Sequence, residues 1–155
     1  MKLFVAIFLS LLIKVATSQD FPELDRLIQI ADSIRGNAVF FGPHLDYFNT
    51  DTTDTELLGT SVTYYRINDL NYTKETDVIF SNYKSSSHYS WYVFKGEPII
   101  FSKQEFENRV LKFNITFFIS NREIIGLSFI GDLNGEEINE IEKELKDKIQ
   151  NKNWL

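Results

Sequence analysis

Two histidines, His44 and His88, are the imidazoles that this sequence offers for acid–base chemistry near neutral pH. A pair of histidines can hydrolyse a substrate by acting as general acid and general base, as in some secreted nucleases. Neither lies in an H-x-E motif or has a second histidine four residues later, and no G-x-S-x-G motif accompanies them. The sequence therefore predicts that the protein is not an enzyme. A small secreted hydrolase that uses His44 or His88 is the alternative.

The composition excludes several other chemistries. The chain has no cysteine, so it cannot form a disulfide, a thiolate nucleophile or a cysteine-ligated zinc site. Its seven glycines are scattered singly, so there is no glycine-rich loop to hold a phosphate, and we expect no cofactor. The formal net charge of −6, without any basic stretch, argues against a nucleic-acid partner.

One cluster of oxygen-bearing side chains has the chemistry that calcium prefers. Its members are Asp46, Asn49, Asp51, Asp54 and Glu56. Their spacing does not match an EF-hand, which places ligands at every second position and a glycine at the sixth. We therefore predict no metal site.

Aromatic residues make up 15% of the chain and gather in its middle. Because neighbouring side chains on a strand point to opposite faces of the sheet, Tyr64 and Tyr65 must lie on different faces. The same holds for Trp91 and Tyr92. Two interpretations stay open: an aromatic core covered on both sides, or a sheet face that binds an amphipathic ligand. For the second interpretation the candidate ligand-binding residues are Tyr65, Tyr89, Trp91 and Phe94.

Two N-x-[ST] motifs predict N-linked glycosylation, at Asn71 and at Asn114. Asn71 lies in a polar stretch, residues 68–77, that is expected to be a loop. Asn114 falls on the outward side of a predicted strand, where a glycan could be accommodated.

The first 18 residues are typical of a secretory signal peptide. Lys2 gives a positive start, residues 3–13 form an apolar stretch, and Ala16 and Ser18 are small residues before a cut at Gln19. A membrane anchor needs about 20 apolar residues, so this stretch is too short for one. We expect cleavage between Ser18 and Gln19, secretion to the extracellular space and no membrane span.

Helices are expected at both ends of the remaining chain. From Asp20 to Arg35 apolar residues recur at helical spacing, and Gly36 is expected to end the helix in a left-handed conformation. Residues 135–151 repeat this spacing, with acidic residues first and lysines later, as the helix dipole favours.

Between the helices, β-branched and aromatic residues dominate and alternation with period two predicts strands. The clearest is 109–120, followed by a turn at Asn121-Arg122 and a returning strand at 123–130. Further strands are expected at 57–67, 77–83, 88–95 and 99–102, and one around Phe40 and Phe41. Residues 84–87 and 95–98 are expected to be connections, and 104–108 one helical turn.

This order of elements predicts an α+β fold. We expect residues 19–155 to form one globular domain: an antiparallel, curved or partly closed sheet of about six strands, flanked by an N-terminal and a C-terminal amphipathic helix. The layout resembles cystatins and lipocalins, but the Q-x-V-x-G hairpin of the former and the early G-x-W of the latter are absent, so no family is assigned.

The leading functional hypothesis is a secreted, glycosylated, non-enzymatic binding protein of a fluid such as venom or saliva. Its partner would be a small amphipathic molecule held by the aromatic sheet, or an extracellular protein. A third hypothesis is an interaction effector without a cavity. An enclosed cavity lined by the four candidate aromatic residues would favour the carrier.

Overall fold

The computed structural model of the chain describes residues 21–40, 45–48, 59–79 and 85–154. The predicted signal peptide and its cleavage at Ser18 and Gln19, the helix start at Asp20, His44, and the carboxylate cluster after Asp46 lie outside these residues. The elements are α2 (Phe21–Asn37), β1 (Val39–Phe40), β2 (Leu45–Phe48), β3 (Gly59–Asn68), β4 (Asn71–Ile79), β5 (Ser85–Phe94), β6 (Glu97–Glu107), β7 (Val110–Ser120), β8 (Glu123–Gly131) and α3 (Gly135–Gln150).

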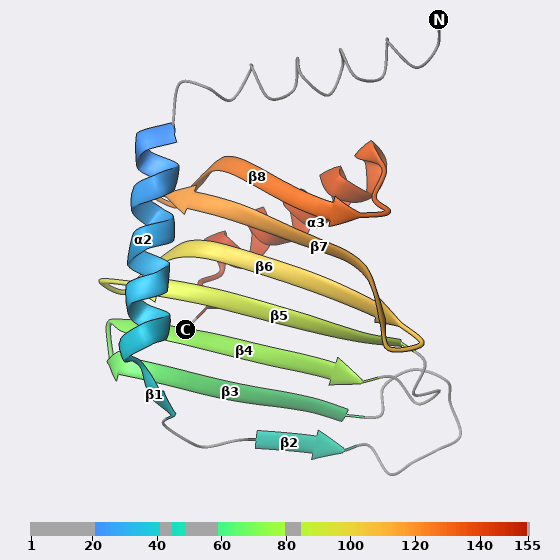
Figure 1. The fold of residues 1–155 in the computed structure, drawn as a ribbon, viewed down its shortest axis with the longest axis horizontal. Coiled ribbons are helices and arrows are strands. Elements are labelled where there is room, and N and C mark those ends of the chain that lie inside the picture. Colours follow the sequence, from blue (N-terminus) through green and yellow to red (C-terminus); the bar gives the residue numbers. More distant parts are fainter. Residues whose placement is uncertain (1–20, 41–44, 49–58, 80–84, 155) are drawn as a thin grey trace, which may run out of the picture.

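The strands form an open antiparallel sheet in which each long strand pairs with the next one in sequence (Figure 1). The six long strands run from β3 to β8, and the short β1 and β2 both pair with the outer side of β3. Two-residue turns at Lys95-Gly96, Asn108-Arg109 and Asn121-Arg122 connect three of the hairpins, and all six residues have positive φ. Such turns match the twist of the strands, so each one places its two strands side by side.

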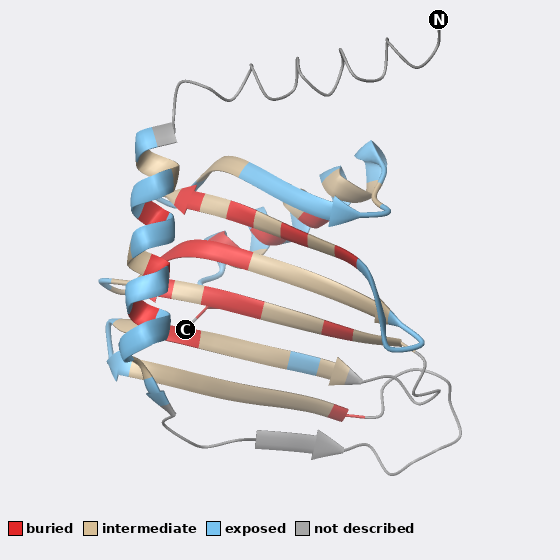
Figure 2. Ribbon diagram, viewed as in Figure 1, coloured by how far each residue is buried: buried red, intermediate tan, exposed pale blue. Residues whose placement is uncertain are grey.

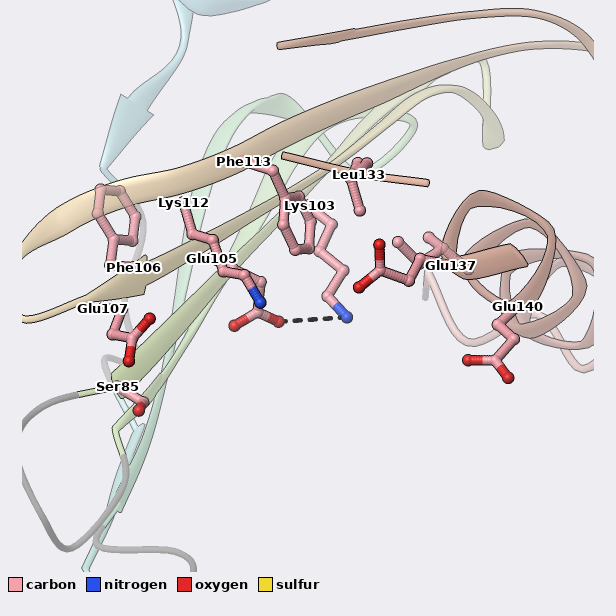
Figure 3. Close-up of a pocket in the computed structure, with 11 residues that line it drawn as sticks. Ser85, Lys103, Glu105, Phe106, Glu107, Lys112, Phe113, Leu133, Glu137 and Glu140 are labelled. Atoms are coloured by element: carbon pink, nitrogen blue, oxygen red, sulfur yellow. Dashed lines mark ion pairs between the residues drawn. The ribbon is translucent and has the colours of Figure 1, made fainter. Parts of the chain in front are cut away.

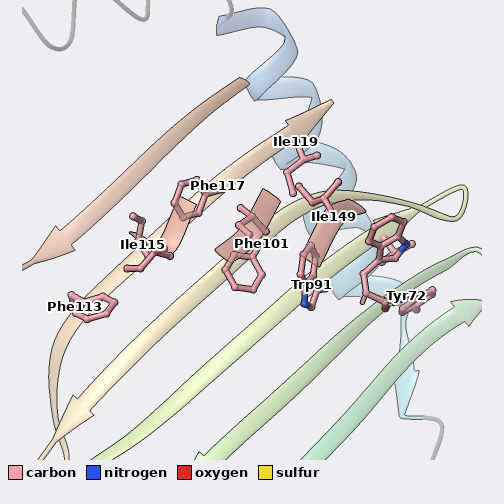
Figure 4. Close-up of a cluster of buried hydrophobic side chains, with 12 residues drawn as sticks. Tyr72, Trp91, Phe101, Phe113, Ile115, Phe117, Ile119 and Ile149 are labelled. Carbon is pink, nitrogen blue, oxygen red and sulfur yellow. Dashed lines mark hydrogen bonds between the residues drawn. The ribbon is translucent and has the colours of Figure 1, made fainter. Parts of the chain in front are cut away.

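The two helices cover opposite faces of this sheet (Figure 1). Leu27, Ala31 and Ile34 of α2 pack against Ile99 and Ile100 of β6. On the other face, α3 packs against a larger cluster that includes alternate residues of β7 (Figure 4). The buried members of that cluster are Tyr72, Trp91, Val93, Phe101, Phe113, Ile115, Phe117, Ile119, Ile141, Leu145, Ile149 and Trp154.

The predicted hairpin at 109–130 is confirmed as β7 and β8. The alternation predicted for its first strand is seen in the burial of the side chains. Residues from Phe113 to Ile119 are alternately buried and half-buried along β7 (Figure 2). The C-terminal helix is confirmed with a one-residue difference at its end. It begins at a capping box, in which the Asn134 side chain accepts hydrogen bonds from the backbone of Glu136 and Glu137.

Several predicted boundaries are wrong. The polar stretch 68–77 is a turn followed by β4, and the turn expected at 104–108 belongs to β6, which continues to Glu107. The connection expected at 84–87 already belongs to β5 from Ser85 onward. Polar residues can form these strands because each strand is hydrogen-bonded to a neighbouring strand on both sides. Such a strand needs apolar side chains on one face only. Gly36 lies within α2, which continues to Asn37.

Trp154 holds the C-terminal end of the chain against three hairpin ends. The side chain is 1% exposed, and its indole N–H donates to the carbonyl of Gly96 over 3.3 Å. The Tyr72 hydroxyl donates to the Trp154 carbonyl over 3.1 Å, and the Arg122 guanidinium lies 5.8 Å from the Trp154 ring centroid. The segment after α3 is therefore tied to the turns between β3 and β4, β5 and β6, and β7 and β8.

We predict that Trp154→Ala lowers the free energy of unfolding by about 3–5 kcal/mol, because it empties a buried site the size of an indole. Val110→Ala is the control, since Val110 is 68% exposed and its loss should change stability by less than about 0.5 kcal/mol. Urea denaturation of both variants measures the difference. Equal stability of the two variants would contradict this role of Trp154.

Candidate functional site

The sheet face beneath α2 is polar over much of its area. Strand alternation places Thr73 and Glu75 of β4 on the α2 face, together with His88, Ser90 and Tyr92 of β5. The apolar side chains of α2 cover only one end of this face, where they meet Ile99 and Ile100. The remainder of the face lies beside the helix as a polar surface.

Two adjoining cavities, of about 390 and 290 Å³, lie between α2 and this surface. They share Arg35, Glu75 and Tyr92, and we call them together the α2 groove. Its other lining residues are Ile28, Ala31, Asp32, Ala38, Tyr65, Thr73, His88, Ser90, Ile100, Ser102, Gln104, Thr116 and Phe118.

A threonine between two tyrosines forms the floor of the 390 Å³ cavity. Tyr65 on β3 lies directly opposite Thr73 on β4, which in turn lies opposite Tyr92 on β5. Thr73 is 3% exposed, and within the described ranges its Oγ1 atom has no hydrogen-bond partner. A buried hydroxyl without a partner costs about 1–3 kcal/mol, so this atom marks a position where a bound molecule would be favourable.

Three charged groups act on the hydroxyl of Tyr92. Burial raises the pKa of Tyr92, Arg35 lowers this pKa, and the carboxylates of Glu75 and Asp32 add to the rise. Arg35 and Glu75 line both cavities from opposite sides, one on the helix and one on the sheet. Across the part of the chain that the structure describes, neither of them has an ion-pair or hydrogen-bond partner. The 390 Å³ cavity thus carries one cation and one anion without an ion pair between them, and Asp32 adds a second carboxylate to the adjoining cavity.

A His–Asp pair lies at the end of the groove. His88 Nδ1 and Asp77 Oδ1 are 2.7 Å apart, and this hydrogen bond raises the pKa of His88 despite the opposing effect of burial. Cross-strand register gives the row Ser61, Asp77, His88, Gln104. A Ser-His-Asp triad needs the serine on the side of the imidazole away from the aspartate, whereas Ser61 is next to Asp77. The row therefore does not assemble a triad.

A pocket of about 430 Å³ lies on the opposite face, between α3 and the ends of β6 and β7 (Figure 3). Its inner charges satisfy one another: Lys103 Nζ is 3.2 Å from a carboxylate oxygen of Glu105, and the other oxygen accepts a 2.8 Å hydrogen bond from Ser87. Glu137, at its rim, takes part in the capping box of α3. Because these groups already have partners, we place the candidate site in the α2 groove.

The structure separates the four aromatic residues predicted to bind a ligand. Tyr65 lines the α2 groove, and Phe94 packs on the same face in the apolar cluster beneath α2. Trp91, 5% exposed, is a member of the core beneath α3, and Tyr89 packs against that core. The four therefore do not line one common cavity.

Sequence reasoning missed Thr73, Glu75 and Arg35 as groove residues. Alternation along 71–79 could have placed Thr73 and Glu75 on one face, but the polar composition of this stretch was interpreted as a loop. No local sequence pattern indicates that Arg35 lines the groove, because its position depends on how α2 lies across the sheet.

Both predicted glycosylation sites are in strands. Asn71 begins β4, and its side-chain oxygen accepts a 2.9 Å hydrogen bond from the backbone N–H of Lys95. Asn114 is half-buried on the α2 face of β7 and accepts a 3.0 Å hydrogen bond from the Ser102 hydroxyl. Glycosylation at the two positions remains a prediction.

Comparison with known proteins found no matching family model, no matching curated protein and no matching solved structure. Among the residues described, no helix has the length and apolar character needed to cross a membrane. The same residues contain no group of three or more histidine and carboxylate side chains that could hold a metal ion.

We predict that Asp77→Asn lowers the pKa of His88, because it replaces a charged acceptor by a neutral one. The pairing raises the pKa of His88 in the folded state above its unfolded-state pKa of about 6.5. It therefore stabilises the fold fully at pH values below about 6.5, and this contribution is lost as the pH rises through the folded-state pKa. NMR titration of the His88 ring measures the shift. Asp132→Asn is the control, and an unchanged His88 titration in Asp77→Asn would contradict the pairing.

Proposed function

We propose that the protein is a secreted, glycosylated, non-enzymatic binding protein that holds a small amphipathic molecule in the α2 groove. The observation that carries this proposal is the buried, unpartnered hydroxyl of Thr73 between Tyr65 and Tyr92. A fold gains nothing from such a hydroxyl, whereas a ligand that bonds to it removes the penalty.

The lining of the groove suits an amphipathic molecule. Tyr65 and Tyr92 supply aromatic side chains that suit an apolar body, while Thr73, Glu75 and Arg35 supply a hydroxyl, an acceptor and a donor for polar groups. The 390 Å³ cavity falls within the range of about 300–1,000 Å³ that is typical of sites for small molecules, and the 290 Å³ cavity adjoins it. A protein partner recognised by a flat surface would not require polar groups inside a cavity, so the small-molecule form of the hypothesis is favoured.

The His88–Asp77 pair favours a second candidate, a small hydrolase. Asp77 would hold the imidazole, which would then act as general base on a water molecule at a substrate in the groove. The two functions differ in what happens to the ligand. A binding protein returns its ligand chemically unchanged after long incubation with excess ligand, whereas a hydrolase returns cleaved products, and His88→Gln abolishes their formation.

We predict that native mass spectrometry of the secreted, enzymatically deglycosylated protein shows an added mass that disappears on denaturation. Thr73→Val should lose most of it, because the hydroxyl that the ligand bonds is replaced by a methyl group. The spectrum before deglycosylation tests a mature chain that begins at Gln19 and carries sugars at Asn71 and Asn114. A bare mature mass would contradict the carrier.

Two control variants make the Thr73→Val result interpretable. The change also destroys the Asn71 acceptor motif, so Asn71→Gln controls for the loss of the sugar. Thr60→Val controls for a threonine-to-valine change on a strand away from the groove. Loss of the added mass in either control would contradict a specific role of Thr73.

We further predict that Thr73→Val stabilises the ligand-free protein by about 1 kcal/mol, since the valine removes a buried hydroxyl that has no partner. Urea denaturation of protein made in a host that adds no N-glycans measures this effect without interference from the sugar. A loss of stability of about 1 kcal/mol or more would show that the hydroxyl is used by the fold, and would contradict the proposal.

A further inference from the structure

The 390 Å³ cavity of the α2 groove contains one cation and one anion on opposite walls. Arg35 approaches from the last turn of α2, and Glu75 from the middle of β4. Both act electrostatically on the same group, the hydroxyl of Tyr92. Opposite charges in a shared cavity normally pair directly, yet the structure contains no ion pair between these two. A molecule lying between them would satisfy both.

The floor of this cavity is a threonine with a tyrosine on the strand at either side of it. Adjacent strands are about 4.8 Å apart, so the backbones at Tyr65 and Tyr92, two strands apart, are separated by about 10 Å. The smaller side chain of Thr73 lies between them and lines the same cavity. A flat group above Thr73 therefore lies between the two tyrosine side chains, and aromatic rings attract one another at centroid distances of about 4.5–7 Å.

We infer that the ligand is an aromatic amino-acid-like zwitterion: an ammonium group bound by Glu75 and the Thr73 hydroxyl, a carboxylate bound by Arg35, and a ring held between Tyr65 and Tyr92. This inference rests on the proposed binding function. An ammonium group has three donors and reaches both Glu75 and Thr73, while a guanidinium binds a carboxylate through two parallel hydrogen bonds. A simple amine would leave Arg35 without a partner, and a simple carboxylate would leave Glu75 without one.

Three probes with the same phenyl body test the two charges separately: L-phenylalanine, phenethylamine, which lacks the carboxylate, and 3-phenylpropanoate, which lacks the ammonium group. Calorimetric titration uses the full mature protein after any co-purified ligand has been dialysed away, with its bare mass as proof of removal. It should give saturable binding of L-phenylalanine. Each of the other two should bind about tenfold more weakly or worse, because one charged group of the cavity loses its partner.

Two variants assign the charges to residues. Glu75→Gln should weaken phenylalanine and phenethylamine but leave 3-phenylpropanoate unchanged, and Arg35→Gln should weaken phenylalanine and 3-phenylpropanoate but leave phenethylamine unchanged. Glu123→Gln and Arg109→Gln, at exposed positions outside the groove, are the matched controls. Circular dichroism and the melting temperature of each variant confirm that it is folded.

The remaining outcomes overturn the inference. If phenethylamine or 3-phenylpropanoate binds as tightly as phenylalanine, the ligand class is a simple amine or a simple acid. If none of the three probes binds, the ligand is not an aromatic zwitterion. The proposed function is judged separately, because a native added mass that Thr73→Val removes would stand even when all three probes fail.

Discussion

Because side chains alternate along each strand, the two faces of this sheet carry different sets of residues: the main core beneath α3 and the groove beside α2. On β7, Phe113, Ile115 and Phe117 point into the core beneath α3, while Asn114 and Thr116 point to the α2 face. The α3 face supplies most of the buried apolar surface, from β4 to β7 and from the C-terminal segment. The α2 face can therefore carry polar groups that would be costly in a core.

This division makes the unpartnered Thr73 hydroxyl tolerable. Its cost of about 1–3 kcal/mol is a sizeable part of the 5–15 kcal/mol by which domains are usually stable. The cluster beneath α3 offsets it, with Trp91 and Phe101 in ring contact at 4.6 Å and with Trp154 fixing three turns from the same side. The groove and the cluster beneath α3 share strands but not side chains, so changes to the polar groove residues should leave the fold intact.

The sequence allowed the elements with strong local signals to be predicted. The two-residue turn at Asn121-Arg122, the alternation of β7 and the apolar spacing of both helices are local patterns. Only residues 77–79 of β4 fell in a predicted strand, because the polar residues before them resemble a loop until the neighbouring strands are placed. The groove depends on long-range structure: the register that sets Thr73 between Tyr65 and Tyr92, and the path of α2 that brings Arg35 into the same cavity as Glu75.

Ligand binding in the α2 groove is tested most directly by a crystal structure of the secreted protein, purified without denaturation from the cells that express it. We predict non-protein density between Tyr65 and Tyr92, with a polar atom within about 3.2 Å of Thr73 Oγ1. The contradicting result is a groove filled by the protein's own side chains, with the Thr73 hydroxyl bonded to one of them.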